Sequence, residues 1–364
     1  EHIEWDIEAA EKGGFEHFMM KEIFEQPKAV RDTITPRIRN GHIVLDDITL
    51  TAEELRRFTK INIVACGTAY HVGVVAKYAF EELLRIPVEV DVASEFRYRD
   101  PIIDDKTLCI YISQSGETAD TIAALKLAKA KGAKTLAVSN VIGSSITREA
   151  DYTIYTHAGP EIAVASTKAY TSQVVLMVIL AMYFAEVLGS YDGIEKLKAD
   201  ILDLPAKVEA MLDETDAIKE FSNKVYTEHD MYFLGRGTDY NVAMEGSLKL
   251  KEISYIQCEG FAAGELKHGT ISLIEDGTPV LGLISASEVV AAHTRGNIQE
   301  VAARGANVLT VVEEKLAKAD DDIIVNQVHP FLSPISMVIP TQLIAYYASL
   351  QRGLDVDKPR NLAK

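Results

Sequence analysis

The chain has 364 residues and 48% of them are hydrophobic, which is enough apolar material for two domains of about 150 residues each. Lys and Arg number 37 against 54 Asp and Glu, and the net charge of −17 opposes non-specific binding to nucleic acid or to anionic lipid. The longest uncharged apolar run, residues 174–185, is too short for a membrane span of roughly 20 residues and predicts a buried helix.

The first half of the chain alternates predicted strands with predicted helices. Apolar runs at residues 61–66, 107–113 and 135–140 predict strands, and a helical pattern such as that of residues 118–130 separates them. This alternation predicts an α/β fold with a parallel sheet covered by helices on both faces. Ligands in such sheets favour the carboxyl ends of the strands.

A glycine and three hydroxyl side chains follow the second of these strands, in "SQSGET". Ser113, Ser115 and Thr118 supply the hydroxyls, and Gly116 lets a ligand approach the backbone closely. Free N–H groups and the positive end of the helix dipole favour an anion here. Ser115 considered alone is more typical of a helix cap, but the cluster favours a phosphate site. Because no Gly-Lys-Ser/Thr loop is present, a phosphorylated metabolite fits better than ATP.

The segment "VASTKAYTS" leads into the long apolar helix. Ser166 and Thr167 stand at its predicted start, and Lys168 stands in its first turn. The helix dipole disfavours a cation there unless an anion or an acidic partner lies nearby. Structural capping and ligand contact are equally good interpretations of these residues.

The second half repeats the pattern of the first. "GTAY" at 67–70 matches "GTDY" at 237–240, an offset of 170 residues that also relates 93–96 to 263–266. A third match follows in the same order with a shift of 172, which predicts a duplicated domain. The predicted strands of this half are 231–235, 279–285 and 306–312, separated by predicted helices at 239–257 and 288–303.

The first helix of this second half carries three charges on its apolar side. At about 100° per residue, Glu245, Lys249 and Glu252 fall within about 60° of one another, between apolar neighbours. Glu245 and Lys249 could be an ordinary surface pair, but charges in an apolar arc cost free energy unless they are paired or used. The pattern therefore favours a packed interface or a reaction site, with a solvated face formed by Ser247, Lys251 and Ser254.

Cysteines and histidines give no metal pattern. Cys66, Cys109 and Cys258 form no CxxC pair, and the histidines lack HxH and HExxH spacing, so we expect no metal site. No signal peptide is evident, which favours a reducing, cytoplasmic environment. The start at Glu1 without methionine suggests a part of a longer protein.

Motifs along nearly the whole chain resemble one family. "ACGTAY", "SQSGETADT", "VASTKA", "LGRG", "LKLKEISYI", "GELKHG" and "DVDKPRNLAK" occur in the order typical of the isomerase part of glutamine–fructose-6-phosphate aminotransferase, also called glucosamine-6-phosphate synthase. The resemblance implies two tandem sugar-isomerase (SIS) domains, each a three-layer αβα sandwich with a mainly parallel, flavodoxin-like sheet. The expected parts are an N-terminal helical segment (1–51), a first SIS domain (52–190), a helical connection (191–221), a second SIS domain (222–354) and a C-terminal tail (355–364).

The resemblance also implies a reaction. The family makes glucosamine 6-phosphate from fructose 6-phosphate and ammonia, and a separate glutaminase domain, absent from this sequence, releases the ammonia from glutamine. Glucose 6-phosphate is the expected product when ammonia is lacking, and no cofactor is expected. Implied phosphate contacts are Ser113, Gln114, Ser115 and Thr118, and implied contacts to the sugar or its surroundings are Thr68, Val164, Ser166 and Ala363. Ala69 stands where the family often has serine.

The catalytic roles also come from the resemblance. Glu252 is the implied base for proton transfer between C1 and C2, Lys249 the group that stabilises developing negative charge, and Glu245 a residue that organises the site. His268 is the implied ring-opening residue, acting across a homodimer interface in the neighbouring subunit. Lys364 is the implied imine-forming lysine, which must react as an unprotonated amine. Without the motifs, His268 would be interpreted as structural and Lys364 as part of a disordered tail.

Two other functions are compatible with parts of this pattern. A phosphosugar isomerase would use the same base without nitrogen transfer. A sugar-phosphate-binding regulatory module would need the hydroxyl cluster but no combination of Glu252, His268 and Lys364, and no basic helix-turn-helix segment is evident.

Overall fold

The computed structural model describes residues 12–213 and 215–363, which form two compact units. The Ser113 unit comprises residues 28–159 and 168–203. The Glu252 unit comprises the described residues up to 27, a strap of residues 160–167, and the described residues from 204 on. Helices α3 (Gln26–Ile34) and α10 (Ile194–Leu212) each contain a boundary between the units. The predicted limits of the two SIS domains stay a prediction.

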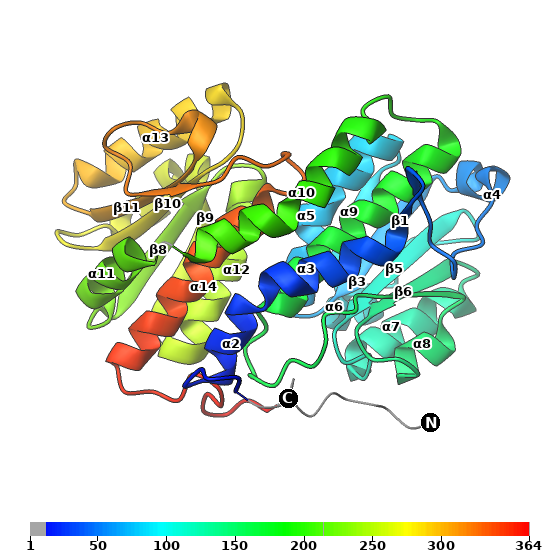
Figure 1. Ribbon diagram of the computed structural model, residues 1–364, viewed down its shortest axis with the longest axis horizontal. Coiled ribbons are helices and arrows are strands. Elements are labelled where there is room, and N and C mark those ends of the chain that lie inside the picture. Colours follow the sequence, from blue (N-terminus) through cyan, green and yellow to red (C-terminus); the bar gives the residue numbers. More distant parts are fainter. Residues whose placement is uncertain (1–11, 214, 364) are drawn as a thin grey trace. The chain divides into compact units, whose positions relative to one another are not determined.

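The Ser113 unit is built on a five-stranded parallel sheet with the strand order β4-β3-β5-β6-β7 (Figure 1). Continuous apolar runs form these strands because both faces of the sheet are covered. The strands are β3 (Lys60–Ala65), β4 (Val88–Val92), β5 (Thr107–Ser113), β6 (Lys134–Ser139) and β7 (Tyr152–Tyr155), and a separate hairpin pairs β1 (Ile38–Arg39) with β2 (His42–Ile43).

Helices cover both faces of this sheet. On one face α5 packs against the sheet and α9, and on the other face α6, α7 and α8 enclose an apolar core around Tyr111. Helix α9 is long and apolar enough to cross a membrane, but 78% of its most apolar window is buried, as in the core helix of a globular domain. The helices are α4 (Ala52–Arg57), α5 (Thr68–Leu84), α6 (Ala93–Tyr98), α7 (Ala119–Ala130), α8 (Ser145–Glu149) and α9 (Lys168–Leu188), with a 3-10 turn at Thr35–Arg37.

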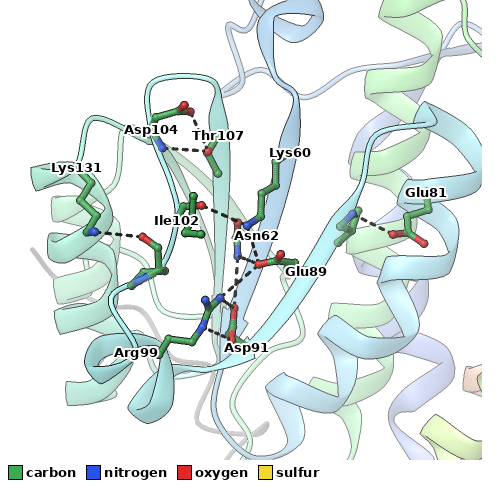
Figure 2. Close-up of polar contacts among 12 residues, drawn as sticks. Lys60, Asn62, Glu81, Glu89, Asp91, Arg99, Ile102, Asp104, Thr107 and Lys131 are labelled. Atoms are coloured by element: carbon green, nitrogen blue, oxygen red, sulfur yellow. Dashed lines mark hydrogen bonds and ion pairs between the residues drawn. The ribbon is translucent and has the colours of Figure 1, made fainter.

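Charged side chains lie along β4, an edge strand of the Ser113 unit (Figure 2). Glu89 forms an ion pair with Lys60 at 2.7 Å, and Arg99 binds both oxygens of Asp91 at 3.1 and 2.8 Å. The amide of buried Asn62 lies 3.4 Å from each of these two carboxylates. Such charges discourage an exposed strand from pairing with a strand of another molecule.

The Glu252 unit repeats this architecture with the parallel order β9-β8-β10-β11-β12 (Figure 1). Helices α11, α12 and α14 pack on one face, and α13 packs on the other with the 3-10 segment Ala263–His268. The strands are β8 (Asp230–Gly235), β9 (Gln257–Ala262), β10 (Pro279–Ile284), β11 (Asn307–Glu313) and β12 (Ile323–Val325). The helices are α2 (Phe18–Phe24), α11 (Asp216–Val225), α12 (Thr238–Ser254), α13 (Glu288–Ala302) and α14 (Ser333–Gln351), with further 3-10 turns at Thr270–Leu273 and Glu314–Leu316.

The backbone confirms the predicted duplication. Helices α5 and α12 both have 17 residues, and each follows a glycine of nearly the same conformation, Gly67 (φ 57°, ψ −131°) and Gly237 (φ 60°, ψ −128°). Each helix also ends at a left-handed residue, Arg85 or Tyr255. The left-handed turn at Tyr255 ends α12 three residues before the predicted end, so that Gln257 begins β9 instead.

Candidate functional site

Helix α12 buries its three charged residues together. The side chains of Glu245 and Lys249 are 0% and 1% exposed and that of Glu252 is 15% exposed. The Lys249 amine lies 2.7 Å from Glu252 Oε2 and 3.6 Å from Glu245 Oε1. The predicted juxtaposition of these residues on one apolar side is therefore confirmed.

Lys249 remains a cation in this setting. Burial lowers the pKa of its amine, but Glu245, Glu252 and the more distant Glu161 outweigh burial and raise the pKa above its ordinary value. The Lys249 cation forms the shorter of its two ion pairs with Glu252, at 2.7 Å. The pair thus places a carboxylate beside a buried positive charge, in a site largely shielded from water.

The predicted solvated face of α12 is wrong. Ser247 and Ser254 are 3% and 0% exposed, and Lys251 is half-buried. Each serine hydroxyl donates to a carbonyl of its own helix, Ser247 to Met244 and Ser254 to Leu250, so both can lie among apolar neighbours. Packing of α12 between its sheet and α14 covers this second side, which helical periodicity alone could not reveal.

The Ser113 unit gathers the predicted phosphate residues in the loop that leads from β5 to α7. Ser113 Oγ accepts from the N–H of Gly116 at 3.1 Å and lies 3.1 Å from Thr118 Oγ1. The Ser115 hydroxyl accepts from the N–H of Glu117 at 3.2 Å. The backbone carbonyl of Gln114 accepts from the backbone N–H of Asn140 at 3.1 Å. Because α7 begins only at Ala119, the interpretation of Ser115 as its cap is wrong.

Glycine is required in this loop. Gly116 has φ 69°, and a Cβ atom on it would lie 2.0 Å from Ser144 Oγ and 3.0 Å from Ser139 Oγ. Hydroxyls from the ends of β5 and β6 therefore converge on the loop, at the edge of the sheet where ligands of such folds bind. Thr68 begins α5 in the same unit, directly after β3 and Gly67.

In the corresponding loop of the Glu252 unit, a carboxylate of the chain itself occupies the hydrogen-bond donors. Asp239 in the first turn of α12 is 1% exposed and accepts from Ser285 N–H at 2.8 Å and from the Ser285 hydroxyl at 2.5 Å. Burial raises the pKa of Asp239 despite these hydrogen bonds. The repeat relates Asp239 to Ala69 and Ser285 to Ser113, so the loop of the Ser113 unit has no carboxylate at this position.

The strap brings two further predicted contacts into the Glu252 unit. Val164 N–H donates to the carbonyl of Asp357 at 3.0 Å. Buried Glu161 accepts from the Ser166 hydroxyl at 2.7 Å and from Thr167 N–H at 2.8 Å. Glu161 was not predicted, because no local motif marks a carboxylate that accepts from residues five and six positions later in the chain.

The other predicted residues lie at the surface of the same unit or outside the described part. His268 is exposed at the end of a 3-10 segment, and Ala363 is exposed near the C-terminus. Lys364 and the first 11 residues of the expected N-terminal helical segment lie outside the described residues. The structure therefore joins Glu245, Lys249 and Glu252 in one unit and the predicted phosphate residues in the other.

Comparison with known proteins gives concordant matches. The SIS domain family matches residues 54–183 and 224–352. A glutamine–fructose-6-phosphate aminotransferase (isomerizing) of Clostridium perfringens is 57% identical over 372 residues, covering 100% of this chain and 61% of that protein. Its counterpart in Streptococcus mutans is 56% identical over 364 residues, covering 99% and 60%. The chain thus spans about three fifths of the length of these relatives.

A solved structure resembles the chain over its whole length. The C-terminal domain of glucosamine-fructose-6-phosphate aminotransferase from Francisella tularensis superimposes with a TM-score of 0.91 at 38% sequence identity. The match covers 96% of this chain and 100% of that domain. The predicted fold of two SIS repeats is confirmed.

Proposed function

Because the chain belongs to the SIS domain family, and within it to the C-terminal part of glutamine–fructose-6-phosphate aminotransferases, we propose that it converts fructose 6-phosphate and ammonia into glucosamine 6-phosphate. The observation that carries this proposal is the buried ion pair of Lys249 and Glu252. Charged side chains are costly to bury, and proton transfer gives this pair a use.

Each unit has its own part in the proposed reaction. The loop of Ser113, Gln114, Ser115 and Thr118 holds the phosphate through hydroxyl and backbone N–H groups. In the sugar, Glu252 moves a proton between C1 and C2, while the Lys249 cation stabilises the negative charge that develops on the enolamine or enediolate. Glu245 keeps Lys249 protonated, since its carboxylate helps to raise the pKa of that amine. The remaining proposed sugar contacts are Thr68, Val164, Ser166 and Ala363.

Two further roles concern residues at the surface or beyond the described part. His268 opens the sugar ring from the neighbouring subunit of a homodimer, and its exposure leaves the imidazole accessible to a partner. Lys364 forms an imine with the C2 carbonyl of the sugar. We further propose that a glutaminase domain of the full-length protein supplies the ammonia, that no cofactor takes part, and that the enzyme acts in the cytoplasm.

The proposal is tested by replacing Lys364 with arginine, which keeps the positive charge but does not form an imine. We expect the Lys364→Arg variant to lose formation of glucosamine 6-phosphate from fructose 6-phosphate and ammonium, while it still binds the sugar phosphate. Product can be followed by mass spectrometry and binding by calorimetry. Full activity of the variant would exclude the imine role. A chain that forms glucose 6-phosphate but never the amino sugar would instead be a phosphosugar isomerase.

A further inference from the structure

Three separate segments of the Glu252 unit each bury one carboxylate. We name Glu22, Glu161 and Asp357 the carboxylate clasp; they are 1%, 6% and 9% exposed. They come from helix α2, from the strap (residues 160–167) and from the tail (residues 352–363) that follows α14. Neither the sequence patterns nor the proposed reaction assigns these residues a role.

Asp357 connects all three segments. Its side chain accepts from the N–H groups of Phe18 and Met19 in α2 at 2.9 and 2.8 Å. Its carbonyl accepts from Val164 N–H in the strap at 3.0 Å. One residue of the tail thus fixes both the first turn of α2 and a strap residue proposed to contact the sugar.

The other two clasp residues order the strap itself. Glu22 accepts from the N–H groups of Ile162 and Ala163, the latter at 3.2 Å. Glu161 accepts from Ser166 and Thr167, as described above. Hydrogen bonds from N–H groups to carboxylates are charge-assisted and among the stronger ones in proteins, so the strap is held along most of its length.

A second anchor brings the tail to the end of α12. Arg360 N–H donates to the Tyr255 hydroxyl at 2.7 Å, and the Arg360 guanidinium lies 4.0 Å from the centre of the Tyr255 ring. Tyr255 follows α12 directly, three positions after Glu252. The tail is therefore attached at Asp357 and again at Arg360, and Lys364 follows four residues after the second attachment.

We infer that Asp357 is a positioning residue for the reaction, which sets the strap with Val164 and Ser166 and the tail as far as Ala363 in one fixed arrangement. This inference rests on the proposed function for its consequence in catalysis, but the clasp itself can be tested without turnover. Misplacement of a reacting group by about 1 Å can lower a rate about 10²-fold, so a residue without contact to substrate can control kcat.

The test compares Asp357→Asn with Asp322→Asn. Asparagine keeps the shape of Asp357 but removes its charge, and its NH₂ group replaces one of the two oxygens that accept from the Phe18 and Met19 N–H groups. Asp322 is an exposed control in the same unit that matches Asp357 in the number of hydrogen bonds, because it accepts from the N–H and hydroxyl of Thr310 at 2.8 and 2.9 Å, and it is absent from the clasp. For each variant we would measure hydrogen exchange of residues 160–167 and 352–363, then kcat and the affinity for fructose 6-phosphate.

Asp357→Asn weakens the side-chain bonds that hold the tail to α2. We therefore expect faster exchange in the tail and in the strap, which the tail binds through the carbonyl of residue 357, but no such change in Asp322→Asn. We also expect kcat of Asp357→Asn to fall about 10²-fold, with an affinity change below about threefold because the phosphate residues belong to the other unit. Asp357→Glu, which restores the carboxylate, should recover part of kcat. Unchanged exchange, or an equal loss of kcat in both Asn variants, would overturn the inference.

The two proposals fail in different ways. If the unaltered chain forms no glucosamine 6-phosphate, the proposed function fails, and the exchange rates alone decide about the clasp. If the unaltered chain is active and Asp357→Asn matches it in both exchange and kcat, only the positioning role is refuted.

Discussion

At the scale of single residues, Lys249 shows how neighbours reverse the effect of burial. An isolated buried amine loses its proton readily, whereas Glu245 and Glu252 hold the pKa of Lys249 above its ordinary value. The stability that Lys249 gives to the folded chain and its proposed catalytic role therefore both depend on these two carboxylates. Removing either carboxylate would affect both.

We predict that Lys249→Met lowers the free energy of unfolding by about 3–5 kcal/mol, because it removes the cation that buried Glu245 faces at 3.6 Å. Denaturant titration measures this loss. The double variant Lys249→Met, Glu245→Gln should recover part of it, since no buried charge then remains at position 245. Equal stability of the original chain and Lys249→Met would refute this view of the pair.

The direction of the pKa shift of Lys249 also determines how its contribution to stability depends on pH. Because the pKa of Lys249 is higher in the folded than in the unfolded chain, its stabilisation is complete below the unfolded pKa of about 10.4. This stabilisation is lost as the pH rises through the pKa of Lys249 in the folded chain. The original chain should therefore lose more stability above about pH 10 than Lys249→Met does.

At the scale of elements, the two repeats differ most where their loops meet the first helix turn. In the Glu252 unit, Asp239 occupies the hydrogen-bond donors of Ser285, whereas Ala69 leaves the corresponding position of the Ser113 unit without a carboxylate. A duplicated scaffold can thus keep the proposed anion site in one repeat, while a carboxylate of the chain itself occupies the corresponding hydrogen-bond donors in the other.

We predict that Ala69→Asp weakens binding of fructose 6-phosphate by about tenfold or more, because a carboxylate then competes with the phosphate and repels it. Calorimetric titration gives the affinity. Ala69→Ser, which introduces the residue often found in the family, is the matched control and should bind nearly as well as the original chain. Unimpaired binding by a folded Ala69→Asp variant would contradict the proposed phosphate site.

Close packing of α12 sets the position of its charges. A Cβ atom on Gly246 would lie 2.6 Å from the ring of buried Phe233 and 2.8 Å from Thr341 in α14. We predict that Gly246→Ala costs about 1–3 kcal/mol of stability. Gly296→Ala in α13 should instead add about 0.4–1 kcal/mol, because no atom lies within 4 Å of the new methyl group. Thermal unfolding of both variants tests this contrast, which equal shifts would contradict.

At the scale of the whole molecule, the sequence was sufficient for the features that repeat locally. The strands at 107–113 and 231–235 and the duplicated glycine turns follow from periodicity and internal similarity, and the structure has them within one residue of the predicted bounds. The three charges of α12 could be predicted in the same way, because a helix brings residues three and four positions apart onto one side.

Features that depend on distant segments could not be predicted. Ser247 and Ser254 are buried in a helix that packs between its sheet and α14, an element about 90 residues later in the chain. The hydrogen bonds of Asp357 reach residues more than 300 positions away, in α2. Such contacts have no local pattern, so only the folded chain reveals the strap, the tail and the clasp that joins them.

The most direct test of the whole account is NMR of the chain with fructose 6-phosphate in deuterated buffer, with and without ammonium, alongside Glu252→Gln. We predict glucose 6-phosphate without ammonium and glucosamine 6-phosphate with it, each with solvent deuterium at the carbon that receives the proton. Glu252→Gln should abolish that incorporation. Binding of the sugar without turnover by the unaltered chain, or undiminished exchange in Glu252→Gln, would contradict the assignment of Glu252 as the base.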